Sequence, residues 1–182
     1  MMIDWTGRDT TADQLRIEAV LDARSLTRNK QLLHVGIGNS RFAQRFASQV
    51  ALIDGLTVAE PERAFADTLS IGNYTVYCIS KYSRDFLLRI EHQYDYIVDN
   101  NLASYACCRY HLYRMFDNYV WCLRRQGRIL TDQGGMDWTV DDDPRWQLSY
   151  DDLVDIGYRF DLTVARVTDT VYELRRAEKG GA

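Results

Sequence analysis

The chain has 182 residues and a formal net charge of −4, with apolar and charged fractions of 46% and 26% that are ordinary for a globular protein. This length fits one domain with a full hydrophobic core. The acidic balance argues against binding to duplex nucleic acid, which needs a basic face. No apolar run approaches the roughly 20 residues of a membrane helix, and Met1–Arg24 lacks the pattern of a signal peptide. We therefore expect a cytoplasmic protein that binds no membrane.

Residues 1–30 are polar and contain one helical pattern. Thr10 or Thr11 is suited to cap a helix. The apolar positions of this helix recur with a rough helical spacing at Leu15, Ile17, Val20, Leu21 and Leu26. We expect a helix ahead of the first strand, either packed on the core or lying over the mouth of a binding site.

Residues 31–43 carry the most informative motif. An apolar run, Leu32–Val35, ends at Gly36 and Gly38 and passes into a helix predicted over 39–49. Glycines permit positive φ and close approach of a ligand, and the helix start offers free N–H groups. This pattern predicts a cradle for a nucleotide-like ligand. The third glycine of a dinucleotide fingerprint and the G-K-[ST] of a P-loop are both missing.

The rest of the chain alternates strands with helices. Strands are predicted within 50–59, 74–79, 94–99, 128–132, 162–166 and 170–175. Helices are predicted over 62–69, 83–91, 104–125 and 149–156, with Ser83 and Ser149 as caps and Gly127 ending the long helix. Residues 133–148 are expected to be irregular. The alternation predicts a parallel sheet with helices on both faces.

The segment Gly36-Ile37-Gly38-Asn39-Ser40 resembles the glycine-rich loop of class I S-adenosylmethionine-dependent methyltransferases. The resemblance covers residues 30–176. It implies a three-layer, Rossmann-like α/β fold with a seven-stranded, mostly parallel sheet in the order 3-2-1-4-5-7-6, the last strand being antiparallel. One domain would span 1–182, with a helical segment over 1–30, a cofactor-binding core over 31–132, and an acceptor loop with closing strands over 133–182.

The resemblance also implies S-adenosyl-L-methionine as cofactor and S-adenosyl-L-homocysteine as product, bound at the carboxyl ends of the strands. Twelve residues would bind the cofactor: His34, Gly36, Gly38, Asn39, Ser40, Thr57, Glu60, Ser80, Lys81, Tyr82, Asp99 and Asn100. His34 stands where the family usually has an acidic residue. Thr57 or Glu60 would reach the ribose hydroxyls, because an oxygen acceptor can bind a diol.

Four residues are expected to bind the acceptor: Asn101, Tyr105, Asp132 and Trp138. Asn100 is not followed by the Pro-Pro pair of the enzymes that methylate adenine or glutamine. Asp99, Asp132, Tyr105 and His111 are candidate bases, and the sequence does not rank them. The implied reaction is methyl transfer to an O or N atom of a small molecule.

Other functions stay open. Methylation of protein lysine, a non-methyl transfer, a non-catalytic partner subunit and a NAD-binding Rossmann domain are the alternatives. The sequence does not decide the oligomeric state, and a homodimer stays open.

Zinc ligands are the remaining chemical group to consider. The chain has four cysteines and three histidines, at Cys78, Cys107, Cys108, Cys122, His34, His92 and His111. No C-x-x-C pair occurs and the histidines are scattered, so we expect no metal site and reduced thiols.

Overall fold

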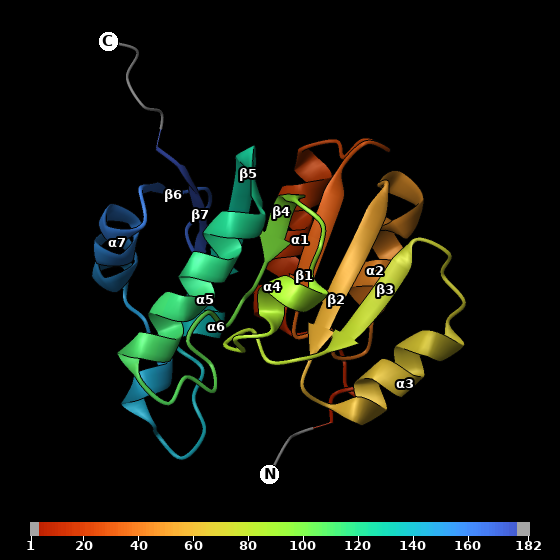
Figure 1. Ribbon diagram of the computed structural model, residues 1–182, viewed down its shortest axis with the longest axis horizontal. Coiled ribbons are helices and arrows are strands. Elements are labelled where there is room, and N and C mark those ends of the chain that lie inside the picture. The colour runs from red at the N-terminus through yellow and green to blue at the C-terminus, as the bar shows by residue number, and fades with distance from the viewer. Residues whose placement is uncertain (1–3, 178–182) are drawn as a thin grey trace.

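The computed structural model describes residues 4–177, and seven strands of this part of the chain form one sheet (Figure 1). The strands are β1 (Gln31–Val35), β2 (Leu52–Thr57), β3 (Tyr74–Cys78), β4 (Tyr94–Val98), β5 (Leu123–Asp132), β6 (Leu162–Arg166) and β7 (Val171–Arg176). Their order is β3-β2-β1-β4-β5-β7-β6, with β7 antiparallel to both neighbours. The order that the resemblance implied is confirmed.

The helices that connect the strands are short. They are α1 (Ala12–Ala23), α2 (Arg41–Phe46), α3 (Glu60–Thr68), α4 (Phe86–Arg89), α5 (Arg109–Cys122), α6 (Gln133–Met136) and α7 (Tyr150–Arg159). Two 3₁₀ helices are η1 (Ala47–Gln49) and η2 (Pro144–Trp146). No helix within residues 4–177 is both long and apolar enough to cross a membrane.

The order in which strands are added to the sheet reverses at its centre, between β1 and β4. β1 pairs in parallel with β2 on one side and with β4 on the other. Consecutive connections therefore leave β1 and β4 toward opposite sides, and a crevice opens outside the carboxyl ends of these strands. This crevice is where the polar residues of the site gather.

Two hydrophobic clusters hold helices to the two faces of the sheet. Ile17 and Leu21 of α1 pack with Phe42 and Phe46 of α2 on one face. The other face is covered by α4, α5 and α7 through a larger cluster of apolar side chains, which includes Phe86, Phe116, Tyr119, Leu153 and Ile156. Figure 1 shows α5 crossing in front of the sheet and α1 behind it.

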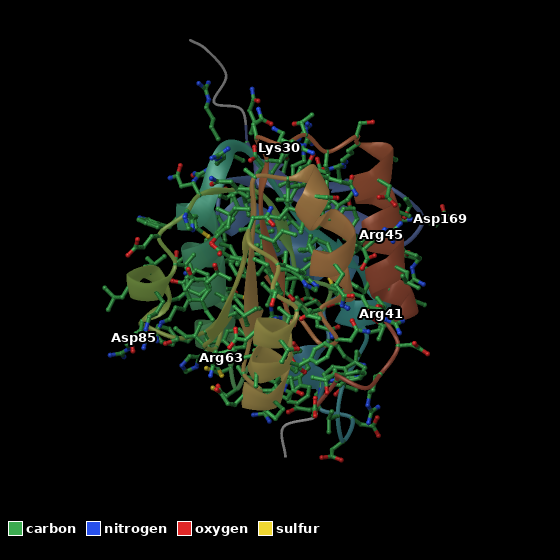
Figure 2. All side chains as sticks on the ribbon, turned by 90° about the vertical axis from the view of Figure 1, so that its right-hand side faces the viewer. Lys30, Arg41, Arg45, Arg63, Asp85 and Asp169 are labelled. Atoms are coloured by element: carbon green, nitrogen blue, oxygen red, sulfur yellow. The ribbon has the colours of Figure 1, made fainter. Side chains whose placement is uncertain are left out.

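The first of these faces is closed at its surface by ion pairs. Arg45 of α2 binds Glu18 of α1 at 2.7 Å and also binds Asp22. Arg41 binds Asp9 at 3.0 Å. Figure 2 looks onto the edge of the sheet at β3 and α3 and shows Arg41 and Arg45 on the right, between α2 and α1. These contacts tie the residues before β1 to the helix that follows it.

The long helix predicted over 104–125 is wrong at both ends. α5 begins at Arg109, and residues 100–108 form a loop. β5 already begins at Leu123, so Gly127 lies within a strand. The guanidinium of Arg124 binds Asp95 at 2.9 Å, across the pairing of β5 with β4. Strand pairing thus overrides the helical pattern at residues 123–125, where Arg124 and Arg125 had been predicted to form the last turn of the helix.

Smaller differences concern the helix starts. The helix predicted over 39–49 divides into α2 and η1, and that predicted over 83–91 shrinks to α4, with Asp85 in place of Ser83 as the cap residue. The irregular 133–148 stretch contains α6 and η2. Ser149 caps α7 through a complete capping box, as predicted.

Candidate functional site

The glycine loop, Gly36–Ser40, turns the chain from β1 into α2. Gly36 and Gly38 have φ values of +76° and +48°, which side chains rarely adopt. A Cβ on Gly36 would meet open space, so the backbone here faces a free volume. Asn39 closes the loop by donating to the carbonyl of Arg8 at 2.7 Å. The loop is therefore preformed.

Beside this loop lies a cavity of about 250 Å³. Its walls come from the ends of β1 to β4 and from the segment before β1. Thirteen of the sixteen predicted site residues line it: His34, Gly36, Gly38, Asn39, Thr57, Ser80, Lys81, Tyr82, Asp99, Asn100, Asn101, Tyr105 and Trp138. The tertiary fold thus collects residues from five separate segments of the sequence.

Ser40, Glu60 and Asp132 lie outside the cavity lining. Ser40 is buried, and its Oγ lies 3.2 Å from the hydroxyl of Tyr74. Asp132 is fully buried, where it binds Arg16 at 2.9 Å and accepts a hydrogen bond from the N–H of Gly134. Both side chains are buried away from the cavity, and their polar atoms are engaged in contacts within the protein.

Glu60 does not reach the cavity because its side chain points outward and pairs with Arg63. The carboxylate that lines the cavity is Glu62, two positions further along the first turn of α3. Two helical positions differ by about 200° in direction, so only one of these side chains can face inward. Glu60, predicted to bind the cofactor, therefore does not line the cavity, and the carboxylate on its wall is Glu62; the choice between the two depends on the rotation of α3 about its axis.

Glu62 is held in place from two sides. Thr57 donates to its Oε2 at 2.6 Å and the N–H of Trp5 donates to its Oε1 at 3.2 Å. Glu62 is only 4% exposed, and this burial raises the pKa of its carboxyl group. Thr57, itself predicted as a ribose contact, therefore positions the carboxylate.

His34 forms another part of the cavity wall. Its ring is buried and stacks on Phe42 with ring centroids 4.2 Å apart. Neither ring nitrogen has a hydrogen-bond partner in the described part of the chain. Burial lowers the pKa of His34 to about 3, so the ring is neutral at physiological pH. A neutral imidazole offers one donor and one acceptor.

A buried charge network closes the inner end of the cavity. The ammonium of Lys81 lies 2.9 Å from Asp99 and 2.6 Å from the carbonyl of Asn101. Tyr119 donates to the same oxygen of Asp99, Oδ2, at 2.7 Å. Burial lowers the pKa of Lys81, against the opposing effect of Asp99. Both groups follow strand ends, and their pairing fixes the loop after β4.

The same loop is tied down by two further contacts. The hydroxyl of Tyr82 donates to the carbonyl of Ser104 at 2.7 Å, and the amide of Asn100 binds Asp13. Ser80 accepts from the N–H of Tyr82 at 3.2 Å. The Oδ1 of Asn101 is buried, and no hydrogen-bond donor within residues 4–177 pairs with it.

Three aromatic side chains, the aromatic rim, pack together: Tyr105 and Trp138 line the cavity, and Trp146 packs against both of them from outside the lining. Tyr105 lies 4.7 Å from Trp146 and 6.0 Å from Trp138, measured between ring centroids, and the two indoles stack at 5.7 Å. Tyr105 has a φ of +63°, an unusual value for this residue type. The rim joins the loop after β4 to the loop after β5.

The segment before β1 supplies eight lining residues that the motifs did not indicate. Its cavity residues are Trp5, Arg8, Asp9, Thr10, Thr11, Asp13, Gln14 and Glu18. Arg8 lies over the ring of Trp5 at 4.8 Å. The segment and its helix were expected either over the mouth of the site or on the core, and they do both: Gln14 and Glu18 face the cavity while Ile17 enters the core.

The four candidate bases are separated by the fold. Asp99 is paired with Lys81, Asp132 is paired with Arg16, and His111 lies outside the cavity lining. Only Tyr105 lines the cavity without a charged partner among the interactions of the described residues. His111 instead gathers with two cysteines, contrary to the scattered arrangement expected from the sequence.

No model of a known protein family and no curated protein sequence matches this chain. Solved structures do match. The N-methyltransferase NodS from Bradyrhizobium japonicum, in complex with S-adenosyl-L-homocysteine, superposes with a TM-score of 0.69 at 14% identity, covering 93% of this chain and 90% of NodS. The sugar N-methyltransferase KedS8 from a Streptoalloteichus species gives 0.68 at 13% identity, covering 94% and 90%.

An S-adenosylmethionine-dependent methyltransferase from Clostridium acetobutylicum gives a TM-score of 0.68 at 10% identity, covering 96% of this chain and 91% of that one. At sequence identities this low, the superpositions establish the architecture of the chain and nothing more specific. The chain has the Rossmann-like fold of the class I S-adenosylmethionine-dependent methyltransferases.

Proposed function

We propose that this protein binds S-adenosyl-L-methionine and transfers its methyl group to an O or N atom of a small molecule. The observation that carries the proposal is the meeting of the glycine loop and the buried Glu62 carboxylate at one cavity, at the switch point of the sheet. The matching structures with this fold are methyltransferases by their descriptions, which supports the same ligand class.

The residues present fit this cofactor. The open space beside Gly36 admits a ligand against the backbone, and the unpaired atoms of His34 and Asn101 offer hydrogen bonds to polar groups. Glu62 would accept from the two ribose hydroxyls, with Thr57 orienting it. The absence of a phosphate-binding lysine in the loop suits a ligand without phosphate.

When bound, the cofactor supplies an already activated methyl group. The chain then needs to align an acceptor and exclude water, which proximity and desolvation achieve without a strong base. Two members of the aromatic rim, Tyr105 and Trp138, line the cavity and suit a small acceptor with an apolar or planar part. Tyr105 is a candidate base that lines the cavity, but burial raises the pKa of its phenol, so at neutral pH it would donate a hydrogen bond to an acceptor and would not take up a proton.

The state of the cysteines supports a proposal for the cellular compartment of the protein. The four cysteines are free thiols in the described part of the chain. A cytoplasmic compartment, where thiols stay reduced, suits this state. We propose the cytoplasm as the working location.

Isothermal titration tests the cofactor. We expect S-adenosyl-L-homocysteine to bind with micromolar affinity and NAD not to bind. Gly38→Arg should abolish binding, because the new side chain enters at a φ of +48° beside Trp5. Gly72→Arg, in a turn with open space and outside the cavity, is the matched control and should bind like the wild type.

Binding of neither ligand by the wild type would contradict the proposal. A mass increase of one methyl on an acceptor separates methyl transfer from a non-methyl transfer. Binding without turnover of any small molecule or peptide would favour the non-catalytic partner subunit.

A further inference from the structure

A second cluster of reactive side chains lies outside the cavity lining, where the loop after β4 enters α5. The Sγ atoms of Cys107 and Cys108 are 3.7 Å apart. The Nδ1 of His111 lies 3.0 Å from the first sulfur and 3.2 Å from the second. These three ligand atoms come from five consecutive residues, and the first turn of α5 brings His111 back over the cysteines.

The spacing matches the edges of a metal tetrahedron. With zinc–sulfur and zinc–nitrogen bonds of about 2.3 and 2.0 Å, tetrahedral angles give about 3.8 Å between two sulfurs and about 3.5 Å between sulfur and nitrogen. The observed sulfur separation, 3.7 Å, agrees. The sulfur–nitrogen distances are a few tenths of an ångström shorter, and small rotations of exposed side chains would open them.

The distance between the two sulfur atoms also shows that they do not form a disulfide. A bonded pair of sulfurs would lie about 2.0 Å apart. Both cysteines are exposed and His111 is half-buried, so a cation could reach them from solvent. Two thiolates would balance the charge of one divalent cation.

Within residues 4–177 no fourth histidine, cysteine or carboxylate joins the three. Two cysteines, one histidine and an open position form the ligand set of zinc sites that keep a place for water or substrate, whereas structural zinc sites are closed by four protein ligands. Arg145 lies alongside and donates to the carbonyl of Cys107 at 3.3 Å, which orders the loop without occupying a ligand atom.

We propose that Cys107, Cys108 and His111 bind one zinc-class divalent cation and leave its fourth position open to water or an exogenous ligand. Each thiol loses its proton to solvent on binding. The ion would fasten the end of the loop to the first turn of α5. Tyr105 of the aromatic rim is two residues away, so the site adjoins the cavity wall. This inference does not depend on the proposed cofactor.

Cobalt titration of the metal-free full chain, under a phosphine reductant, tests the site. We expect one Co²⁺ per chain, with thiolate charge-transfer and tetrahedral d–d absorption bands that Zn²⁺ abolishes. Cys108→Ser and His111→Gln should each weaken binding by more than about 100-fold, beyond the 10–100-fold that outer-shell partners cause. Cys78→Ser, an exposed thiol on β3, is the matched control and should bind like the wild type.

Thermal melting provides a second readout. Zinc should raise the melting temperature of the wild type and of Cys78→Ser, and leave His111→Gln unchanged. Equal melting of all variants without metal verifies that they fold. A wild type that binds no Co²⁺, or binding that survives in both Cys108→Ser and His111→Gln, would overturn the proposal, leaving only sulfur–imidazole hydrogen bonds.

Discussion

The two sides of the cavity are built by different means. On the side of β1 and β2, a glycine loop and one buried carboxylate are held by short hydrogen bonds, and their positions follow from strand ends. On the side of β4 and β5, the wall is an aromatic rim carried by two irregular loops. The first side is suited to a ligand of fixed shape. Substitutions in the loops of the second side could change which acceptor binds, without altering the first side.

The Lys81–Asp99 pair stands where the two sides meet, and its removal should have the largest effect. Lys81→Met leaves a buried carboxylate without its cation and should cost about 3–5 kcal/mol in the free energy of unfolding. Lys30→Met is the matched control, because Lys30 pairs with Asp95 at a more exposed place and should cost less than about 1 kcal/mol. Urea unfolding measures both, and equal values would refute the buried-pair argument.

The next effect concerns the carboxylate of the β2 side and rests on the proposed function. Glu62→Gln keeps the shape but loses charge-assisted hydrogen bonds, which are worth about 1.5–3 kcal/mol. We expect S-adenosyl-L-homocysteine to bind about 10–100-fold more weakly in isothermal titration. Glu60→Gln, on the outer face of the same helix turn, should leave the affinity unchanged. A larger loss in Glu60→Gln would restore the original assignment.

The neutral state of His34 should appear in the pH dependence of stability. The unfolded chain takes up a proton on this ring near pH 6.5, whereas the folded chain does so only at about pH 3. Between these values the unfolded state binds more protons, so stability falls as the pH is lowered, by up to about 1.4 kcal/mol per pH unit. His34→Leu removes the one proton by which the two states differ, so it should lower this slope by up to about 1.4 kcal/mol per pH unit.

A second variant at the same position separates the loss of the titratable ring from the loss of packing. His34→Gln removes the same titratable ring but keeps a polar side chain, and it should flatten the slope between pH 6.5 and 4 as His34→Leu does. Denaturant unfolding at several pH values gives the comparison. An unchanged slope in His34→Leu would mean that the ring is hydrated in the folded state.

The smallest effect should come from the aromatic rim. Trp146→Ala removes contacts with Tyr105 and Trp138 and should lower stability by about 0.5–1.5 kcal/mol. Trp146 lies outside the cavity lining, so the affinity for S-adenosyl-L-homocysteine should stay within twofold. A tenfold loss of affinity would show that the two sides of the cavity are coupled, contrary to the division described above.

Some of the site was within reach of sequence reasoning. The glycine loop and the residues that follow strand ends, such as Ser80 and Asp99, were predicted because parallel strands deliver their carboxyl ends to one edge. Glu62 was missed because the choice between Glu60 and Glu62 depends on the rotation of α3. The N-terminal lining was missed in detail because no local motif marks polar residues that face a distant cavity.

The sequence by itself determined the alternation of strands and helices, the glycine turn and the capping box of α7, because these depend on local spacing and backbone preference. The tertiary structure decided where α5 ends and β5 begins, because strand pairing competes with helical periodicity over residues 123–127. It also decided which buried carboxylates pair with arginine and lysine side chains, such as Asp132 with Arg16 and Asp99 with Lys81. The meeting of His111 with two cysteines is local, because the three residues lie within one helical turn, and it was missed because a search for C-x-x-C spacing does not test that distance.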